Sequence, residues 1–147
     1  MASILAIVSK AIFEQDRDWS CGDLYDTSEY VSKNKALGAL VEGGSLFLVT
    51  VRPPDESLWL VAVLEQPVFV GDRWTAPMNA VPIVDISELS TRFVFESGGG
   101  IKAKPGALGM TLQTPRKLTA ADVELLRSVA KPKPPSPAKP QAPQRRR

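Results

Sequence analysis

The sequence predicts an α+β domain, namely a small, mostly antiparallel β-barrel with one early short helix and one C-terminal helix. Short apolar, β-branched runs recur along residues 1–130, and turns rich in glycine, proline or acidic residues separate them. Two segments carry helix-capping patterns. Apolar residues make up 44% of the 147 residues and charged residues 23%, as in ordinary globular proteins, so the domain can bury a core.

The first part of the chain predicts a strand and then a short helix. Residues 4–13 contain an apolar run that predicts the first strand. Residues 32–41, SKNKALGALV, predict a short helix that Ser32 caps and that Gly43 and Gly44 end. Its apolar side chains are expected to share one face: Ala36, Leu37, Leu40 and Val41.

Two longer apolar runs predict buried strands. Residues 45–51 (SLFLVTV) and 58–64 (LWLVAVL) are continuously apolar and rich in β-branched side chains, as buried strands are. Turn residues at 53–56 favour an antiparallel pair. Trp59 lies in the middle of the second run, so core packing is its expected role.

A hairpin is predicted after the second long strand. Residues 68–70 and 73–75 flank Gly71-Asp72, a pair of residues suited to a two-residue turn. Pro67 precedes the hairpin and either ends the previous strand or lies at a sheet edge.

The remaining body predicts two short strands and the last helix. Residues 81–86 and 92–95 predict the strands, with a polar turn between them. Thr119 and Asp122 have the spacing of a capping box, which predicts a helix that Pro132 stops.

Residues 131–147, KPKPPSPAKPQAPQRRR, predict a disordered tail with a polyproline-II bias, because they contain six prolines and no large apolar residue. The tail has no acidic residue, and its basic residues are Lys131, Lys133, Lys139, Arg145, Arg146 and Arg147. The chain has 18 basic and 16 acidic residues, so residues 1–130 retain 12 basic and all 16 acidic ones, a net charge of −4. A mildly acidic body therefore precedes a strongly basic tail.

Missing residue types narrow the chemistry. Histidine is absent and Cys21 is the single cysteine, which excludes intrachain disulfides, histidine-dependent catalytic triads and histidine-ligated metals. Carboxylates gather near Trp19 and offer a cation site, an acid–base pair or a solvated loop: Asp16, Asp18, Asp23 and Asp26. The solvated loop is favoured because glycines at ligand-loop spacing are missing. We therefore expect no enzymatic activity, no cofactor and no metal site.

The first residues predict neither a signal peptide nor a membrane span. Their apolar run is short, no basic segment precedes it, and Lys10 and Glu14 interrupt it. We expect a cytoplasmic protein that does not bind a membrane.

Two segments carry a resemblance to a known family. Residues 32–44 (SKNKALGALVEGG) followed by SLFLVTV resemble the PUA-like superfamily, particularly its EVE and ASCH groups, in which a first strand and helix lead to a Gly-Asp turn and the strand that starts the barrel. Gly44-Ser45 stands where that family has Gly-Asp. Residues 112–122 (LQTPRKLTAAD) are similar to the closing EVE segment, where an arginine-containing strand runs into a final helix.

The PUA-like fold commonly binds RNA or holds a flipped base against aromatic side chains, and the resemblance implies such a site here. Trp19 and Trp74 would stack on bases, and Ser32 and Asn34 would read base edges. Basic side chains would hold phosphate: Lys33, Lys35, Lys102, Lys104 and Arg116. The alternatives are that the two tryptophans form a lid over the barrel end and that residues 32–35 are a helix cap with solvated lysines.

Three consecutive glycines, Gly98 to Gly100, precede Lys102 and Lys104. The spacing matches neither a P-loop nor a dinucleotide-binding fingerprint. A flexible connection is the first interpretation of this segment, and a nucleic-acid clamp is the second.

These observations predict a non-catalytic nucleic-acid-binding module, RNA or DNA, with an aromatic cleft for a base and a basic tail on phosphates. The alternative is a protein-interaction or scaffold module whose tail recruits a partner. Pro134 and Pro137 form a P-x-x-P motif that suits the alternative.

Overall fold

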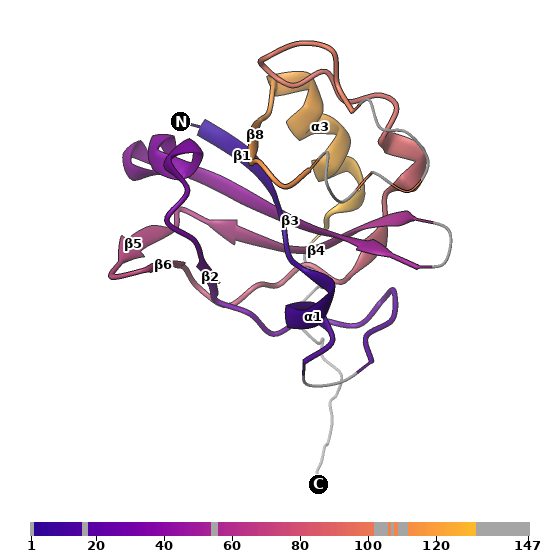
Figure 1. Cartoon of the computed structure of the whole chain (residues 1–147), viewed down its shortest axis with the longest axis horizontal. Coiled ribbons are helices and arrows are strands. Elements are labelled where there is room, and N and C mark those ends of the chain that lie inside the picture. The colour runs from indigo at the N-terminus through magenta and orange to yellow at the C-terminus, as the bar shows by residue number, and fades with distance from the viewer. Residues whose placement is uncertain are drawn as a thin grey trace, which may run out of the picture.

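The computed structural model describes residues 2–15, 18–53, 56–101, 106, 108 and 112–131, and Figure 1 shows their arrangement. A five-stranded central sheet contains β1 (Ala2–Ile7), β3 (Gly44–Arg52), β4 (Ser57–Glu65), β7 (Val84–Asp85) and β8 (Arg116–Lys117), in the order β7-β4-β3-β1-β8. A small sheet contains β2 (Glu29–Val31), β5 (Val68–Val70) and β6 (Arg73–Thr75), in the order β2-β6-β5. β1 and β3 are parallel and the other pairs are antiparallel. The predicted α+β class with mostly antiparallel strands is thus confirmed.

The helical segments are short. They include α1 (Lys10–Phe13), the 3₁₀ helix η1 (Lys35–Glu42), the 3₁₀ helix η2 (Ser87–Leu89) and α3 (Ala120–Val129). Figure 1 shows α3 on one side of the central sheet and the small sheet and α1 on its other side. None of the helices in the described ranges combines the length and apolar character needed to cross a bilayer.

The central sheet is covered on both faces, which explains why its long strands are continuously apolar. Alternate residues of each strand point to opposite faces, so Leu46 and Leu48 pack on one side of β3 and Phe47 and Val49 on the other. The first core, which includes the small sheet, contains Ile4, Ala6, Val8, Phe13, Trp19, Leu37, Leu40, Leu46, Leu48, Val61, Ala62, Leu64, Trp74 and Ile83. The second core, which includes α3, contains Leu5, Phe47, Val49, Leu58, Leu60, Val63, Val81, Ile86, Phe93, Phe95, Leu112, Leu118, Leu126 and Ala130.

Several predicted elements are confirmed. The runs at 45–51 and 58–64 form β3 and β4, which pair antiparallel. The predicted hairpin is β5 and β6, and Gly71 has φ of +70°, as the first central residue of a type II′ turn requires. The capping box is present, because the Thr119 hydroxyl accepts from the Asp122 amide and the Asp122 carboxylate accepts from the Thr119 amide.

The first strand is shorter than predicted. β1 ends at Ile7, and residues 10–13 form α1 instead of continuing the strand. The Ser9 hydroxyl accepts a hydrogen bond from the Ile12 amide at 3.3 Å, so a local cap outweighs the strand-forming side chains.

The early helix differs from the prediction in its type, cap and buried face. It is a 3₁₀ helix whose N-cap is Asn34, with the Asn34 side chain accepting from the Ala36 amide. The hydroxyl of Ser32, the predicted cap, accepts from the Asn34 amide instead. Three residues per turn place Leu37 and Leu40 on one side, and both are buried. Val41 is 74% exposed, so its predicted place on the buried face is wrong.

Residues 92–95 do not form the predicted strand. The Val94 and Phe95 amides donate to the two oxygens of the Asp122 carboxylate, each at 2.8 Å. A side chain of α3 therefore takes the backbone donors that a neighbouring strand would otherwise use.

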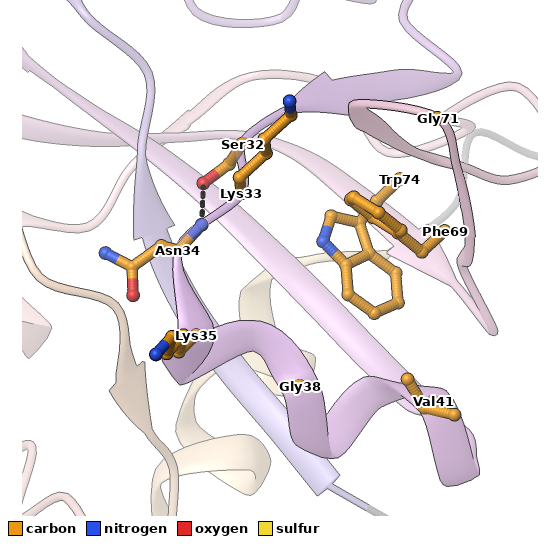
Figure 2. Close-up of a pocket in the computed structure, with 9 residues that line it drawn as sticks. All are labelled: Ser32, Lys33, Asn34, Lys35, Gly38, Val41, Phe69, Gly71 and Trp74. Carbon is orange, nitrogen blue, oxygen red and sulfur yellow. Dashed lines mark hydrogen bonds between the residues drawn. The ribbon is translucent and has the colours of Figure 1, made fainter.

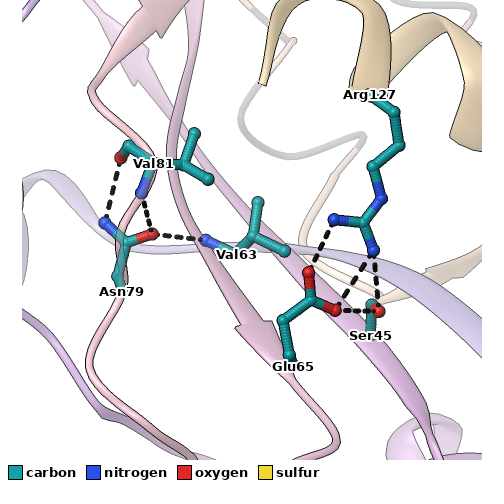
Figure 3. A network of polar contacts seen from close by, with 6 residues as sticks. All are labelled: Ser45, Val63, Glu65, Asn79, Val81 and Arg127. Carbon is teal, nitrogen blue, oxygen red and sulfur yellow. Dashed lines mark hydrogen bonds and ion pairs between the residues drawn. The ribbon is translucent and has the colours of Figure 1, made fainter. Parts of the chain in front are cut away.

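The strand predicted at 81–86 is reduced to β7. Figure 3 shows why: the buried Asn79 side chain accepts from the Val63 and Val81 amides, both at 3.0 Å, and donates to the Val81 carbonyl. Further along, the Ile83 amide donates to the Asp23 carbonyl. A buried amide side chain and a loop thus replace part of the ladder beside β4.

The three glycines after Phe95 form a tight turn. Gly98, Gly99 and Gly100 all have positive φ, and the Gly100 amide donates to the Val94 carbonyl at 3.0 Å. A Cβ atom on Gly100 would lie 2.0 Å from the Phe93 carbonyl oxygen. Close backbone approach therefore explains this glycine.

Figure 3 also shows how α3 is joined to the central sheet. The Arg127 guanidinium donates to the Glu65 carboxylate at 2.6 and 3.1 Å and to the Ser45 hydroxyl at 3.1 Å. Hydrogen bonding from Arg127 is the main cause of the lowered pKa of Glu65. This contact fastens the last turn of α3 to the ends of β3 and β4.

Candidate ligand-binding site

An aromatic row crosses the small sheet. The register pairs Tyr30 with Trp74 and Trp74 with Phe69, so the three side chains share one face of β2, β6 and β5. Trp74 is 4% exposed in the first core, whereas Phe69 on the outer strand is 41% exposed. The Tyr30 hydroxyl donates to the Ile7 carbonyl at 2.7 Å. The row therefore starts beside the central sheet and reaches solvent at Phe69.

The segment leading into η1 faces the outer end of this row. The Ser32 hydroxyl accepts from the Asn34 amide at 3.1 Å, and the Asn34 side chain accepts from the Ala36 amide at 2.9 Å. The Ser32 amide in turn donates to the Asp72 carbonyl at 3.2 Å, which ties this segment to the hairpin turn. These bonds hold the backbone of Lys33 and Lys35 while their side chains extend into solvent.

A hollow of about 350 Å³ lies between the aromatic row and η1, as Figure 2 shows. We call it the aromatic hollow, and it is lined by Ser32, Lys33, Asn34, Lys35, Gly38, Val41, Phe69, Gly71 and Trp74. The Phe69 and Trp74 rings lie 5.2 Å apart between centroids, with planes tilted by 57°. Its volume lies in the range of small-molecule sites.

Among the described residues that line the hollow, the charged ones are Lys33 and Lys35. Among the described residues, neither Lys33 nor Lys35 forms an ion pair within 4 Å. Arg73, on the other face of the small sheet, pairs with Asp72 at 2.9 Å and Glu29 at 2.8 Å. The hydrogen bond from Arg73 is the main cause of the lowered pKa of Asp72, and Lys33 adds to it. Among the described residues at the rim, Lys33 and Lys35 are therefore the cations that are available to bind an anionic ligand.

The structure brings five of the predicted site residues together in the aromatic hollow: Ser32, Lys33, Asn34, Lys35 and Trp74. Phe69 and Val41 also line the hollow and were not among the predicted site residues. The predicted hairpin already contained the signal for Phe69, because a turn at Gly71-Asp72 places it opposite Trp74. Val41 was not predicted to line the hollow, because an α-helical period places it on the buried face of residues 32–41.

Two predicted residues lie elsewhere. Trp19 is 9% exposed in the first core, and its ring packs 5.1 Å from Tyr25 and 6.4 Å from Phe13. Arg116 lies on β8 with its guanidinium 5.7 Å from the Phe95 ring, beside a separate hollow of about 390 Å³. Neither side chain lines the aromatic hollow, so Trp19, Trp74 and Arg116 do not converge on one surface.

Of the remaining predicted cations, one falls within the described residues. Lys131 is exposed just after α3. The others lie outside the described residues, as does the predicted disorder of the tail: Lys102, Lys104, Lys133, Lys139, Arg145, Arg146 and Arg147.

The acidic residues near Trp19 do not form a shared ligand set in the described part of the chain, where no group of three or more acidic or cysteine side chains is placed to hold a metal. Asp16 lies outside that part. The Asp23 carboxylate accepts from the Ser20 amide at 2.8 Å, as a turn-forming side chain does.

Comparisons with known proteins found no match to a protein-family model, a curated protein or a solved structure. The residues that line the hollow provide aromatic and aliphatic surface, two lysine ammonium groups and short polar side chains. Such a site suits the binding of a flat apolar group that carries a negative charge.

Proposed function

We propose that this protein binds single-stranded nucleic acid without catalysing a reaction. An unpaired base lies in the aromatic hollow against Phe69, and neighbouring phosphates lie near Lys33 and Lys35. The observation that carries the proposal is that the predicted residues from the start of η1 and from β6 line one hollow with a half-exposed phenylalanine. Stacking of one base on an aromatic side chain contributes about 1–3 kcal/mol.

The same proposal includes the finer fold assignment, a PUA-like barrel. Its support is the order of the elements, in which a first strand and a short helix precede two long strands, and a closing helix follows the hairpin. A second support is the first core, which joins the small sheet to one face of the central sheet.

The basic tail supplies long-range attraction in this proposal. Its six cations add a salt-sensitive and sequence-independent contribution, while the aromatic hollow selects unpaired bases. The body carries a net charge of −4, so binding by the body alone is weak at high salt.

Fluorescence anisotropy with labelled single-stranded and double-stranded oligonucleotides tests the proposal in the full chain. We expect tighter binding of the single strand at low salt. The double substitution Lys33→Gln/Lys35→Gln removes two phosphate contacts, so the slope of log K against log salt becomes shallower by about 1.4. The matched control is Lys10→Gln/Lys117→Gln, which neutralises two exposed lysines away from the hollow.

Two results would contradict the proposal. One is the absence of binding at low salt, and the other is equal affinity for the full chain and for a synthetic peptide of residues 131–147. Equal losses in the two double variants would remove the aromatic hollow from the binding surface.

A protein-interaction module is the second candidate. The observation that favours it is the gathering of exposed apolar side chains around the small sheet and η1, where Val31, Val41, Val68 and Val70 are each more than half exposed. In this candidate the P-x-x-P motif of the tail recruits a partner. A protein that is retained on the immobilised chain after nuclease treatment, and lost when Pro134 and Pro137 are replaced by alanine, would favour it over nucleic-acid binding.

A further inference from the structure

The outer strand of the small sheet has an open edge. β5 pairs with β6 on one side, and its other side has no partner strand among the described residues. All three of its residues are apolar and exposed: Val68 (60%), Phe69 (41%) and Val70 (57%). Exposed edges of this kind pair readily with another strand unless charge, proline or a bulge prevents it.

The other sheet edges in the described ranges are protected. β7 and β8 are two residues long and carry Asp85 or the pair Arg116 and Lys117. β2 carries Glu29, whose carboxylate pairs with Arg73 across the sheet. β5 has no charged residue, so it lacks the charged side chains that oppose strand pairing at the other sheet edges.

The hairpin geometry sets which backbone groups of β5 face outward. In a two-residue hairpin the residues that flank the turn, here Val70 and Arg73, form a hydrogen-bonded pair. The next pair along the ladder, Phe69 and Trp74, is then a non-hydrogen-bonded one. The amide and carbonyl of Phe69 consequently point toward the open edge.

The sequence of β5, Val-Phe-Val, reads the same in both directions. Antiparallel pairing of two copies about an axis at Phe69 places each Phe69 opposite the other and each Val68 opposite a Val70. The two outward-facing backbone groups of Phe69 then form two hydrogen bonds with their counterparts. Beyond the strand, Gln66 lies opposite Asp72, so no like charges meet directly.

We propose that this protein forms a two-fold symmetric dimer in which β5 pairs antiparallel with β5 of a second copy. The two small sheets become one six-stranded sheet, and the valine pairs lie on the face opposite the aromatic hollow. A two-fold axis is the commonest symmetry of soluble oligomers and requires a self-complementary patch, which a palindromic strand provides. This inference is independent of nucleic-acid binding.

The dimer is weak and depends on concentration. The shared strand is three residues long, and Pro67 has no amide with which to extend it. Such an interface lies below the standard size of about 1,600 Å² that stable complexes bury. Sedimentation velocity of the full chain should therefore show a monomer–dimer equilibrium between about 1 μM and about 1 mM.

Charge-swapped variants test the register. In the dimer of Val68→Lys/Val70→Lys each of these lysines faces a lysine of the second copy, and in Val68→Glu/Val70→Glu each of these glutamates faces a glutamate. Each variant alone should therefore remain monomeric. An equimolar mixture should recover a heterodimer, because every lysine then faces a glutamate. Both positions are exposed in the monomer, so the far-UV circular dichroism of each variant should equal that of the original chain.

The matched control is Val31→Lys on β2, the opposite edge of the same sheet. Val31 and Val70 have the same exposed fraction, 57%, so the control changes surface polarity as much as one of the two substitutions in the test variant does. We expect its dimerisation to be unchanged. Dimerisation that is lost equally in the control would show general apolar association and overturn the proposal.

A monomer at every concentration would also overturn it, as would a mixture of the charge-swapped variants that stays monomeric. A peptide from another protein would be the occupant of the edge if the full chain stays monomeric while a Val-Phe-Val peptide binds it. A disulfide gives a positional test, since Cys21→Ser/Phe69→Cys should cross-link under mild oxidation and Cys21→Ser/Val31→Cys should not.

Discussion

The side chain of Asp122 joins the start of α3 to the loop that contains Val94 and Phe95. Its carboxylate accepts from the amides of Thr119, Val94 and Phe95 at 2.8–3.0 Å, and the residue is completely buried. Burial by itself would raise the pKa of this carboxyl, but the three backbone hydrogen bonds outweigh that effect and lower it. The ionised form is therefore the one that stabilises the fold.

Replacing Asp122 by asparagine should destabilise the protein by about 2–4 kcal/mol, because an amide nitrogen then faces backbone donors that remain buried. A lowered folded pKa means that the stabilisation is present above the unfolded value of about 3.9 and is lost as the pH falls through the folded value. The difference between the two proteins in urea unfolding should thus be largest near neutral pH and shrink below about pH 4.

The exposed residue Glu124 on the same helix provides the control. Glu124→Gln should change the free energy of unfolding by no more than about 0.5 kcal/mol. A difference between the Asp122 variant and the original chain that stays constant down to about pH 2 would contradict the role of the carboxylate charge.

Part of this arrangement was predictable at the scale of the residue. The spacing of Thr119 and Asp122 predicts the capping box, because both partners lie within one helical turn. The bonds to Val94 and Phe95 were not predictable, since they depend on how a loop 27 residues away in the sequence folds against α3.

Among the elements, η1 shows how helix type decides which side chains are buried. Residues 37 and 40 are three apart and share a face in a 3₁₀ helix, whereas Val41 turns away from it. An α-helical period would have grouped Leu37 with Val41 as closely as with Leu40.

Alanine substitutions distinguish the two periods. Leu40→Ala should cost about 2–5 kcal/mol, because a fully buried leucine leaves a cavity in the first core. Val41→Ala should change the free energy of unfolding by no more than about 0.5 kcal/mol, because Val41 is exposed. Chemical denaturation measures both changes, and comparable losses in the two variants would contradict the 3₁₀ arrangement.

Whether a predicted strand forms depends on whether another group binds its backbone amides and carbonyls. The runs that became β3 and β4 are buried on both faces, so their continuous apolar pattern was a strong signal. Residues 92–95 include three apolar residues, but the carboxylate of Asp122 binds the amides of Val94 and Phe95. A largely apolar segment does not form a strand when a side chain binds the backbone amides that a neighbouring strand would use.

At the scale of the whole molecule, one sheet serves two cores. β1, β3 and β4 contribute alternate side chains to each core, so neither core can form without the strands of the other. All three tryptophans, Trp19, Trp59 and Trp74, pack in or against the first core. Their fluorescence therefore reports on the side of the sheet that α3 does not touch.

Leu126→Ala, which removes a buried side chain of α3 from the second core, should test this coupling. We expect a loss of about 2–5 kcal/mol and a tryptophan fluorescence transition that shifts together with the far-UV circular dichroism transition. The reason is that the shared strands unfold as one unit. A fluorescence transition that stays in place while the helical signal shifts would show that the two cores unfold separately.

The candidate site, too, was predictable from the sequence only in part. The residues at 32–35 were predicted as a group because a helix start brings neighbours in sequence together. Trp74 lines the same hollow because the hairpin packs across the start of η1. Trp19 does not line it, because its loop folds into the first core. No local pattern distinguishes these two tryptophans, since both lie among polar residues in the sequence.

The sequence by itself determined the α+β class, the two long buried strands, the hairpin and the cap of the last helix, because each of these depends on residues within a few positions of one another. Only the tertiary structure decided the division into two sheets, the loss of the strand at 92–95 and the membership of the aromatic hollow. Those outcomes depend on which distant groups satisfy each backbone donor and cover each apolar face, and contacts between distant segments leave no periodic signal in the chain.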